Sequence, residues 1–336
     1  MAKFFSVLLL TIITIANTAL VLRGELGNFY LPNSEQTLPT GAFESSHERA
    51  SYAQMLSIYH HGIFNLPIEL ADFGSPDVAY YQGRFYSLFP PGVALVMLFG
   101  YHIGSLFNAN TLVAFATFSL FALGATIFTY LLAKDIFKLS NATSIASAMI
   151  PICASSLLAY SATPVQHAPA AFFLTSALYA AAKYTQRQQY GFIYALYVSI
   201  IYPISIFFDY PNALLLFPVI LYLLSSSISF QNLHKKLKIN LRISIVYAGL
   251  FGLGFLALHP IYNLAAFGDW NMISQFMPTR YRGLEDLEQK LSVQNNTSGG
   301  LSSTFMEERL VNGTDTLLIA HDKGLFFYFP IYIFML

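Results

Sequence analysis

The sequence predicts an all-α, polytopic membrane protein: a helical bundle with a large polar outside loop that carries short juxtamembrane helices. Three observations lead to this fold class. Hydrophobic residues make up 55% of the 336-residue chain and charged residues only 10%, against roughly 25% charged residues in an average soluble domain. The mean hydropathy is +0.54. The apolar residues also gather in runs, several of them near the ~20 residues with which a helix crosses a bilayer.

Eight apolar runs are expected to form helices of a single transmembrane domain, residues 1–336. The first run follows Lys3 and is about as long as a full span, so we predict a membrane helix rather than a cleaved signal peptide. The last run is shorter than a span, and we expect the sequence to be truncated there. The expected helices cover 4–22, 111–133, 142–160, 168–182, 192–208, 213–227, 243–262 and, incompletely, 324–336.

The placement of lysine and arginine predicts a cytoplasmic N-terminus in the plasma or inner membrane, because cytoplasmic loops are enriched in these residues. In this orientation two long segments, 23–110 and 263–323, lie outside, and the first is rich in acids. The pattern requires that 90–107 does not cross, so we expect an interfacial or re-entrant helix there. The basic residues of the inside loops are Lys134, Lys138, Lys183, Arg187, Lys235, Lys236, Lys238 and Arg242.

A short amphipathic helix is predicted at Ser46–His61, in the first outside segment. Ser46 can cap its first turn, and Gly62 can end it. Glu48 lies in that first turn, where the helix dipole stabilises a negative charge. A carboxylate there could accept a proton from an acceptor hydroxyl. The alternative is a solvated glutamate paired with a neighbouring basic side chain.

A tight hairpin is predicted around Gly83, because a glycine after a polar residue between aromatic segments is typical of a two-residue turn. Arg84 follows the turn, and its guanidinium can bind a phosphate with two hydrogen bonds. The alternative is a salt bridge between Asp77 and Arg84 that braces the turn. Both interpretations stay open at the level of the sequence.

Three further polar residues lie at the ends of the expected spans. His167 can be a packing residue or a ligand. Asp209 precedes Pro211 by two residues, and that spacing is common where an aspartate caps a turn. Lys323 can hold a lipid phosphate or extend to the membrane surface.

Several classes of site are not predicted. The sequence has no phosphate-binding Gly-x-x-x-x-Gly-Lys-Ser/Thr loop, no His-Glu-x-x-His and no Gly-x-Ser-x-Gly motif. Its single cysteine, Cys153, excludes an intrachain disulfide and a cysteine-based metal site. The formal net charge is zero and no basic block occurs, so nucleic acid is not an expected partner.

The order of these motifs resembles a known family. A Glu48-Arg49-x-x-Tyr52 helix is followed by Gly83-Arg84-x-Tyr86-Ser87-x-x-Pro90-Pro91-Gly92 and then by a basic inside loop. This order resembles the GT-C superfamily of integral-membrane glycosyltransferases, which includes the protein O-mannosyltransferases and the aminoarabinose lipid A transferases. The resemblance covers residues 1 to about 220 and, loosely, Asp322-Lys323-Gly324-Leu325.

The resemblance implies inverting transfer of a sugar from a polyprenyl-phosphate donor, held in the lipid bilayer, to a protein or glycolipid acceptor at the outer membrane face. Glu48 matches the family's acid that acts as base or orients the acceptor, and His167 stands where the family has a second acid. Phe89 replaces the family's phosphate-binding lysine, so Arg84 or Lys323 would take that role. The implied catalytic residues are Glu48, Asp77 and His167, and the implied substrate-binding residues are Arg49, Tyr52, Arg84, Tyr86, Asp209 and Lys323.

No cofactor and no metal ligands are assigned, and dependence on a divalent metal stays open. The alternative function is a transporter or flippase of lipid-linked saccharides, which would place ionisable residues inside the spans and would use broken helices. A third possibility is a non-catalytic scaffold, which would not need Glu48, Asp77 and Arg84 to converge.

Overall fold

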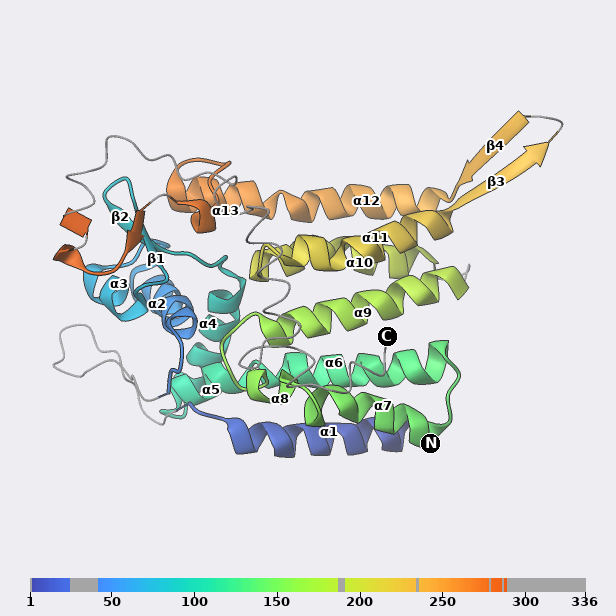
Figure 1. The fold of residues 1–336 in the computed structure, drawn as a ribbon, viewed down its shortest axis with the longest axis horizontal. Helices are drawn as coiled ribbons and strands as arrows, with labels where there is room; N and C mark the ends of the chain where they lie inside the picture. Colours follow the sequence, from blue (N-terminus) through green and yellow to red (C-terminus); the bar gives the residue numbers. More distant parts are fainter. Residues whose placement is uncertain are drawn as a thin grey trace, which may run out of the picture.

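The computed structural model describes residues 2–24, 42–186, 191–233, 236–277, 279–285 and 287–288. The described chain is mostly helical, as the sequence predicts. Long helices lie side by side in a bundle (Figure 1). Short helices and a three-stranded sheet form one end, which we call the cap end, and a two-stranded hairpin projects from the opposite, hairpin end (Figure 1).

The bundle is built from neighbours that pack along their length. Helix α9 packs against both α6 and α10, while α12 packs on α10 and α1 packs on α6. The bundle elements are α1 (Ala2–Val21), α5 (Asn110–Ala116), α6 (Ser119–Leu131), the π-helical turn η1 (Leu132–Ile136), α7 (Asn141–Cys153), α8 (Leu157–Tyr160), α9 (His167–Gln186), α10 (Gly191–Phe208), α11 (Asn212–Ser227), α12 (Ile243–Leu256) and α13 (Leu258–Phe267).

In the part of the chain that the structure describes, four helical stretches are long and apolar enough to cross a membrane, namely Lys3–Val21, Asn110–Ile136, Gly191–Phe208 and Ile243–Phe267. They correspond to four of the expected runs. Helices Asn141–Cys153 and Asn212–Ser227 are apolar but shorter.

The expected run 142–160 is not one helix. Helix α7 ends at Cys153 and α8 begins only at Leu157. Pro151 lies inside the last turn of α7, and a proline there removes a backbone donor and clashes with the preceding turn. The hydroxyl of Ser155 donates to the carbonyl of Pro151 at 2.5 Å, which satisfies an acceptor at the break.

The expected interfacial segment 90–107 contains helix α4 (Gly92–Ser105), which packs against α2 and α5. Two glycines allow α4 to approach α5 closely. A Cβ added to Gly100 would lie 2.8 Å from the Cα of Ala114, and one added to Gly104 would lie 2.6 Å from the carbonyl oxygen of Ala109. Both distances are too short for a side chain, so α4 is held firmly against the bundle.

The cap end contains α2 (Ser46–His61), α3 (Ile68–Gly74) and an antiparallel sheet in the order β2-β1-β5. The predicted helix α2 is confirmed and Gly62 ends it, with φ 67°, but the side chain that caps it is Ser45. The predicted hairpin is confirmed: Gln82 and Gly83 have φ 48° and 79°, as expected in a type I′ turn. The strands are β1 (Val78–Tyr81), β2 (Arg84–Ser87) and β5 (Thr279–Tyr281).

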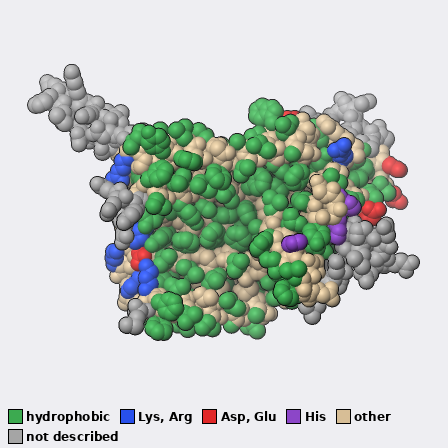
Figure 2. All heavy atoms as spheres, turned by 180° about the vertical axis from the view of Figure 1, so that it is seen from behind, with side chains coloured by type: hydrophobic (Ala, Val, Ile, Leu, Met, Phe, Trp, Pro, Cys, Tyr) green, Lys and Arg blue, Asp and Glu red, His purple; other side chains and the backbone are tan. Residues whose placement is uncertain are grey.

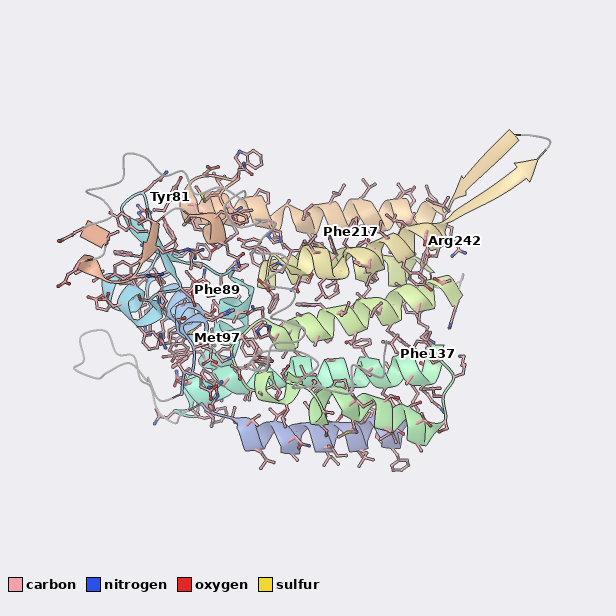
Figure 3. The ribbon with its side chains drawn as sticks, viewed as in Figure 1. Tyr81, Phe89, Met97, Phe137, Phe217 and Arg242 are labelled. Carbon is pink, nitrogen blue, oxygen red and sulfur yellow. The ribbon has the colours of Figure 1, made fainter. Side chains whose placement is uncertain are left out.

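The two ends of the bundle differ in charge. Figure 2 shows a broad apolar band, with Lys and Arg side chains gathered at the hairpin end and His, Asp and Glu side chains at the cap end, where a basic side chain also lies. The hairpin is formed by β3 (Ile228–Leu233) and β4 (Lys236–Leu241), and Arg242 lies at its base (Figure 3). Nearby, Lys3 and Lys183 approach Asp135 at 2.8 and 3.7 Å and so join α1 and α9 to η1.

Candidate functional site

The first turn of α2 places polar side chains where the cap meets the bundle. The hydroxyl of Ser46 donates to Oδ2 of Asp77 at 2.7 Å. The ring of His47 stacks on Phe89, with ring centroids 3.5 Å apart and planes 4° from parallel. Phe89 lies at the boundary between cap and bundle (Figure 3). The stack therefore fixes the His47 ring at this boundary.

His167, the first residue of α9, lies close enough to His47 to affect its charge. Burial, and to a smaller extent the proximity of His167, lower the pKa of the His47 imidazole to about 4. His47 is therefore neutral near pH 7. The ring of His167 also contacts Tyr160, with centroids 4.4 Å apart. The fold thus brings the start of α2 to the start of α9.

Asp209 lies between α10 and α11 and is partly buried. Burial raises the pKa of its carboxyl to about 6, opposed by a hydrogen bond with the side chain of Gln166. Its neighbour Tyr210 hydrogen-bonds Ser274, and burial raises the pKa of the Tyr210 hydroxyl to about 12. None of the ion pairs between described residues involves Asp209.

These contacts connect a group of polar residues, which we call the polar cluster. Asp77 contacts the start of α2, α2 approaches α9, and the loop before α9 contacts Asp209. Asp77, His167 and Asp209, which the sequence nominates, are thus linked through the adjacent pairs Ser46–His47 and Gln166–His167. The polar cluster consists of Ser46, His47, Asp77, Gln166, His167 and Asp209.

Glu48 is adjacent to the polar cluster in sequence but is buried, with its side chain only 4% exposed. The guanidinium of Arg23 donates to Oε1 of Glu48 at 3.1 Å, and the backbone N–H of Glu44 donates to Oε2 at 2.8 Å. Arg23 also donates to the hydroxyl of Thr163 at 3.0 Å. Both carboxylate oxygens are occupied, so these contacts fix α2 relative to the end of α1 and the loop before His167.

Arg49 and Tyr52 also make contacts within the fold. The Arg49 guanidinium donates to the carbonyls of Phe73 at 2.9 Å and Ser75 at 3.2 Å, at the end of α3. Tyr52 is fully buried, and its hydroxyl lies 3.0 Å from that of Thr111. Arg49 thus joins α2 to α3 within the cap, and Tyr52 joins the cap to α5 of the bundle. The expected role of both residues in substrate binding stays a prediction.

Arg84 does not form the alternative salt bridge with Asp77. Arg84 pairs with Tyr81 beside the turn, whereas Val78, the neighbour of Asp77, pairs with Ser87 at the far end of the strands. Three residue steps separate the two ends, about 10 Å along a strand. Arg84 is exposed and hydrogen-bonds Tyr86.

The basic residue near Asp77 is Arg280, on β5. Its guanidinium donates to the carbonyl of Gln275 at 2.8 Å. No sequence pattern marks Arg280, because the three-residue strand β5 is too short to leave a periodic pattern. Tyr86 is buried and its ring packs against Phe267. Lys323 lies outside the described residues.

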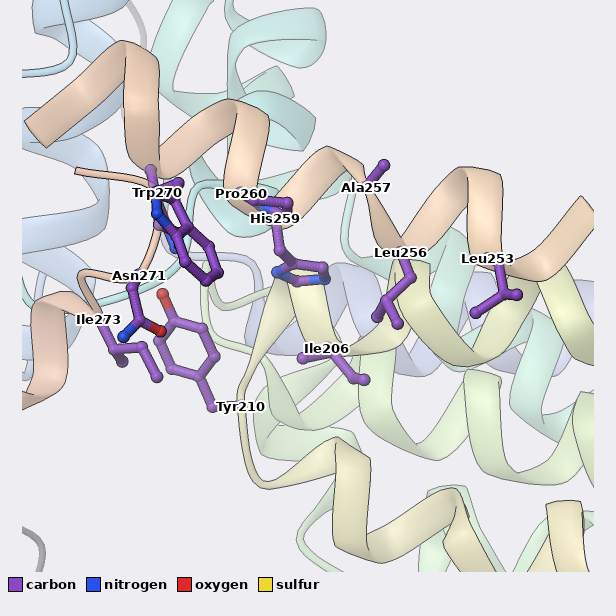
Figure 4. Close-up of a pocket in the computed structure, with 11 residues that line it drawn as sticks. Ile206, Tyr210, Leu253, Leu256, Ala257, His259, Pro260, Trp270, Asn271 and Ile273 are labelled. Atoms are coloured by element: carbon purple, nitrogen blue, oxygen red, sulfur yellow. The ribbon is translucent and has the colours of Figure 1, made fainter. Parts of the chain in front are cut away.

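A groove runs between α10 and α12 and ends near the polar cluster. Its wider part has a volume of about 460 Å³, and a cavity of about 180 Å³ continues it toward the hairpin end, with Leu253 and Leu256 lining both. At the cap end the lining becomes polar. There the Tyr210 hydroxyl points toward Trp270 and Asn271 (Figure 4). We call this feature the α10–α12 groove.

Among the described residues, no group of three His, Cys, Asp or Glu side chains is placed to hold a metal ion. Comparison with known proteins adds no assignment: no family model, no curated protein and no solved structure matches the chain.

Proposed function

We propose that this protein is a polytopic membrane glycosyltransferase that transfers a sugar from a polyprenyl-phosphate donor to an acceptor hydroxyl at the outer membrane face, with inversion. The observation that carries the proposal is the meeting of the α10–α12 groove with the polar cluster. Tyr210 lines the groove, and the preceding residue, Asp209, belongs to the polar cluster. An amphiphilic donor needs this combination of an apolar channel and a polar reaction site.

The membrane placement is supported by the surface of the bundle. Large apolar side chains are exposed along it, for example Leu120 at 63%, Leu214 at 76% and Leu250 at 59%. An extensive apolar surface is unfavourable in water, and contact with lipid removes that cost. The basic hairpin end fits the cytoplasmic side and the acidic cap end fits the outer side.

The orientation can be tested by labelling single cysteines. In a Cys153→Ser background, a cysteine at Gln82, exposed in the cap hairpin, is expected to react with a membrane-impermeant thiol reagent in intact cells. A cysteine at Lys138, exposed at the hairpin end, is expected to react only after the membrane is opened. Labelling of position 138 in intact cells would contradict the proposed orientation.

In the proposed mechanism the donor's isoprenoid tail lies in the α10–α12 groove, and its phosphate lies at the polar end near Tyr210. Asp209 removes the proton of the acceptor hydroxyl as the acceptor oxygen attacks the anomeric carbon. The bond from that carbon to the phosphate oxygen breaks, and its electron pair leaves on the phosphate. A single displacement of this kind inverts the anomeric centre.

The remaining roles follow from the contacts. We assign His47 and His167 to the approach to Asp209, because His167 lies near His47 and follows Gln166, which hydrogen-bonds Asp209. The Glu48–Arg23 pair positions α2. Arg280, partly buried near Asp77, joins Arg84 and Lys323 as a candidate cation for the donor phosphate. The acceptor, protein or glycolipid, binds from the side of the polar cluster.

The proposal predicts a defined product. Purified protein in nanodiscs, given polyprenyl-phosphate sugars labelled in the sugar and a mixture of candidate acceptors, is expected to release polyprenyl phosphate and to move label into an acceptor. Leu253→Trp, which fills the groove at a residue that is 61% exposed, is expected to reduce this release. Leu214→Trp is the matched control, because Leu214 lines neither part of the groove.

A transporter of lipid-linked saccharides remains the second candidate, and the interrupted α7–α8 segment favours it, since transporters use broken helices. The same experiment separates the two functions. A transporter moves the lipid-linked sugar between leaflets without releasing polyprenyl phosphate, and that outcome would contradict the transferase proposal.

A further inference from the structure

A second apolar groove approaches the polar cluster from the other side of α10. It lies between α4, the start of α6 and the end of α10 and has a volume of about 400 Å³. Leu95, Phe99 and Leu120 line it and are 39%, 64% and 63% exposed, so the groove is open along the flank of the bundle. We call it the α4–α6 groove.

The last turn of α10 separates the two grooves. Ile206 lines the α10–α12 groove, whereas Phe207 and Phe208 line the α4–α6 groove. Asp209 follows directly. At the opposite wall, Gly92 lies three residues after Phe89, the ring on which His47 stacks. The two grooves thus lie on opposite sides of the last turn of α10, and each is lined by a sequence neighbour of Asp209, Tyr210 in one and Phe208 in the other.

The lining of the α4–α6 groove favours binding of an apolar group. Its lining is apolar except for Thr117, whose hydroxyl donates to the carbonyl of Val113 in its own helix at 2.7 Å. The groove thus offers little to a headgroup or to a peptide backbone, whose polar groups are costly to bury without partners. A hydrocarbon chain meets no such cost.

The volume of the α4–α6 groove suits a single hydrocarbon chain. About 400 Å³ holds roughly thirteen units of about 30 Å³, the volume share of a water molecule and close to that of a methylene group. A helix with its side chains is about 10–12 Å across, much wider than a single hydrocarbon chain.

From these observations we infer that the acceptor is itself a lipid: its hydrocarbon chain occupies the α4–α6 groove, and its hydroxyl-bearing headgroup lies at the polar cluster. The inference rests on the proposed function, which assigns the α10–α12 groove to the donor. With two chains held on opposite sides of α10, the acceptor oxygen and the donor's anomeric carbon meet beside Asp209. The products are a glycosylated lipid and polyprenyl phosphate, and the acceptor proton moves to Asp209.

Photo-crosslinking with two probes tests the inference. Dodecyl maltoside with a diazirine in its tail represents a hydroxyl-bearing lipid, and farnesyl phosphate with a tail diazirine represents the donor. In nanodiscs the maltoside probe is expected to label α4 and α6, and the phosphate probe is expected to label α12. Unlabelled dodecyl maltoside should compete with the first probe, and maltose should not.

Three substitutions at exposed residues keep the test independent of folding. Leu120→Trp should reduce maltoside labelling of α4 about tenfold or more, equivalent to about 1.4 kcal/mol, and leave the phosphate probe unchanged. Leu253→Trp should do the reverse, and Leu214→Trp should change neither.

The inference is overturned if Leu120→Trp leaves maltoside labelling unchanged, if it weakens both probes equally, or if maltose competes as well as dodecyl maltoside. A crosslink between cysteines at position 120 and within 324–336 would also overturn it, because this chain would then fill the groove. If only the phosphate probe fails to label α12, the donor assignment fails while the α4–α6 groove remains a lipid site.

Discussion

Replacing Asp209 with asparagine is expected to reduce sugar transfer about 100-fold or more, the usual effect of losing a general base. The asparagine keeps the size of the side chain and can keep the hydrogen bond with Gln166, so the fold should be unchanged. Initial rates of polyprenyl-phosphate release, measured beside the melting temperature of the purified protein, test this. Glu69→Gln, at an exposed carboxylate of α3, is the control and should have no effect.

The rate should also depend on pH in a defined direction. The pKa of Asp209 is raised to about 6, and the base acts only when deprotonated, so kcat/KM should fall as pH falls through about 6. His47, with its pKa lowered to about 4, stays neutral over this range and does not produce the decline. Full activity of Asp209→Asn, with loss of activity in Glu48→Gln, would move the base to Glu48.

Asp209 shows how a wrong local interpretation can hide a site. Its position before Pro211 predicts a capping aspartate, yet no side chain caps the start of α11. The turn is held by backbone contacts, with the N–H of Asn212 donating to the carbonyl of Asp209 at 3.1 Å. The carboxyl is thus available for chemistry. Its hydrogen bond with Gln166, the residue before α9, depends on how the helices pack and cannot be read from the sequence.

The features that the sequence predicts well are those with local causes. Helix α2 has its capping serine, its apolar spacing and its final glycine within a short segment, and the cap hairpin needs only the positive φ of Gln82 and Gly83. The break after α7 was not predicted, although Pro151, inside the expected run 142–160, is a local signal for it. Each of these signals acts over a few residues.

The features that the sequence does not predict depend on contacts between distant segments. Strand β5 pairs with β1 across 200 residues, as the register of Val78 with Tyr281 shows, and it brings Arg280 to Asp77. The approach of His47 to His167 similarly depends on the packing of the cap on α9. No periodic pattern or short motif marks such pairs, so the polar cluster emerges only from the fold.

Glu48 illustrates the same limit for a single residue. An acid in the first turn of a helix is compatible with a base and with a structural anchor. Burial decides between them, and burial depends on Arg23, which the sequence places only at the end of the first span. The contacts favour the structural role of Glu48, and they predict how much the free energy of unfolding falls when Glu48 is replaced.

Glu48→Ala is expected to lower the free energy of unfolding by about 3 kcal/mol, the low end of the range for breaking a buried ion pair by removing one partner. The low end applies because Arg23 is 23% exposed and keeps its contacts with Glu44 and Thr163. Glu44→Ala is the matched control. Glu44 pairs with the same guanidinium at 3.0 Å but is 76% exposed, so its loss should cost less than about 1 kcal/mol.

Unfolding followed by tryptophan fluorescence or by thermal aggregation in a mild detergent separates the two substitutions, and transfer rates are measured per folded molecule. An anchoring role predicts that Glu48→Ala loses stability and that the folded fraction keeps part of its activity, because Asp209 is untouched. A catalytic role predicts the opposite pattern, with normal unfolding and transfer reduced as far as in Asp209→Asn. Since Arg23 also holds Thr163, four residues before His167, an anchoring Glu48 is expected to influence the proposed transfer without touching the substrate.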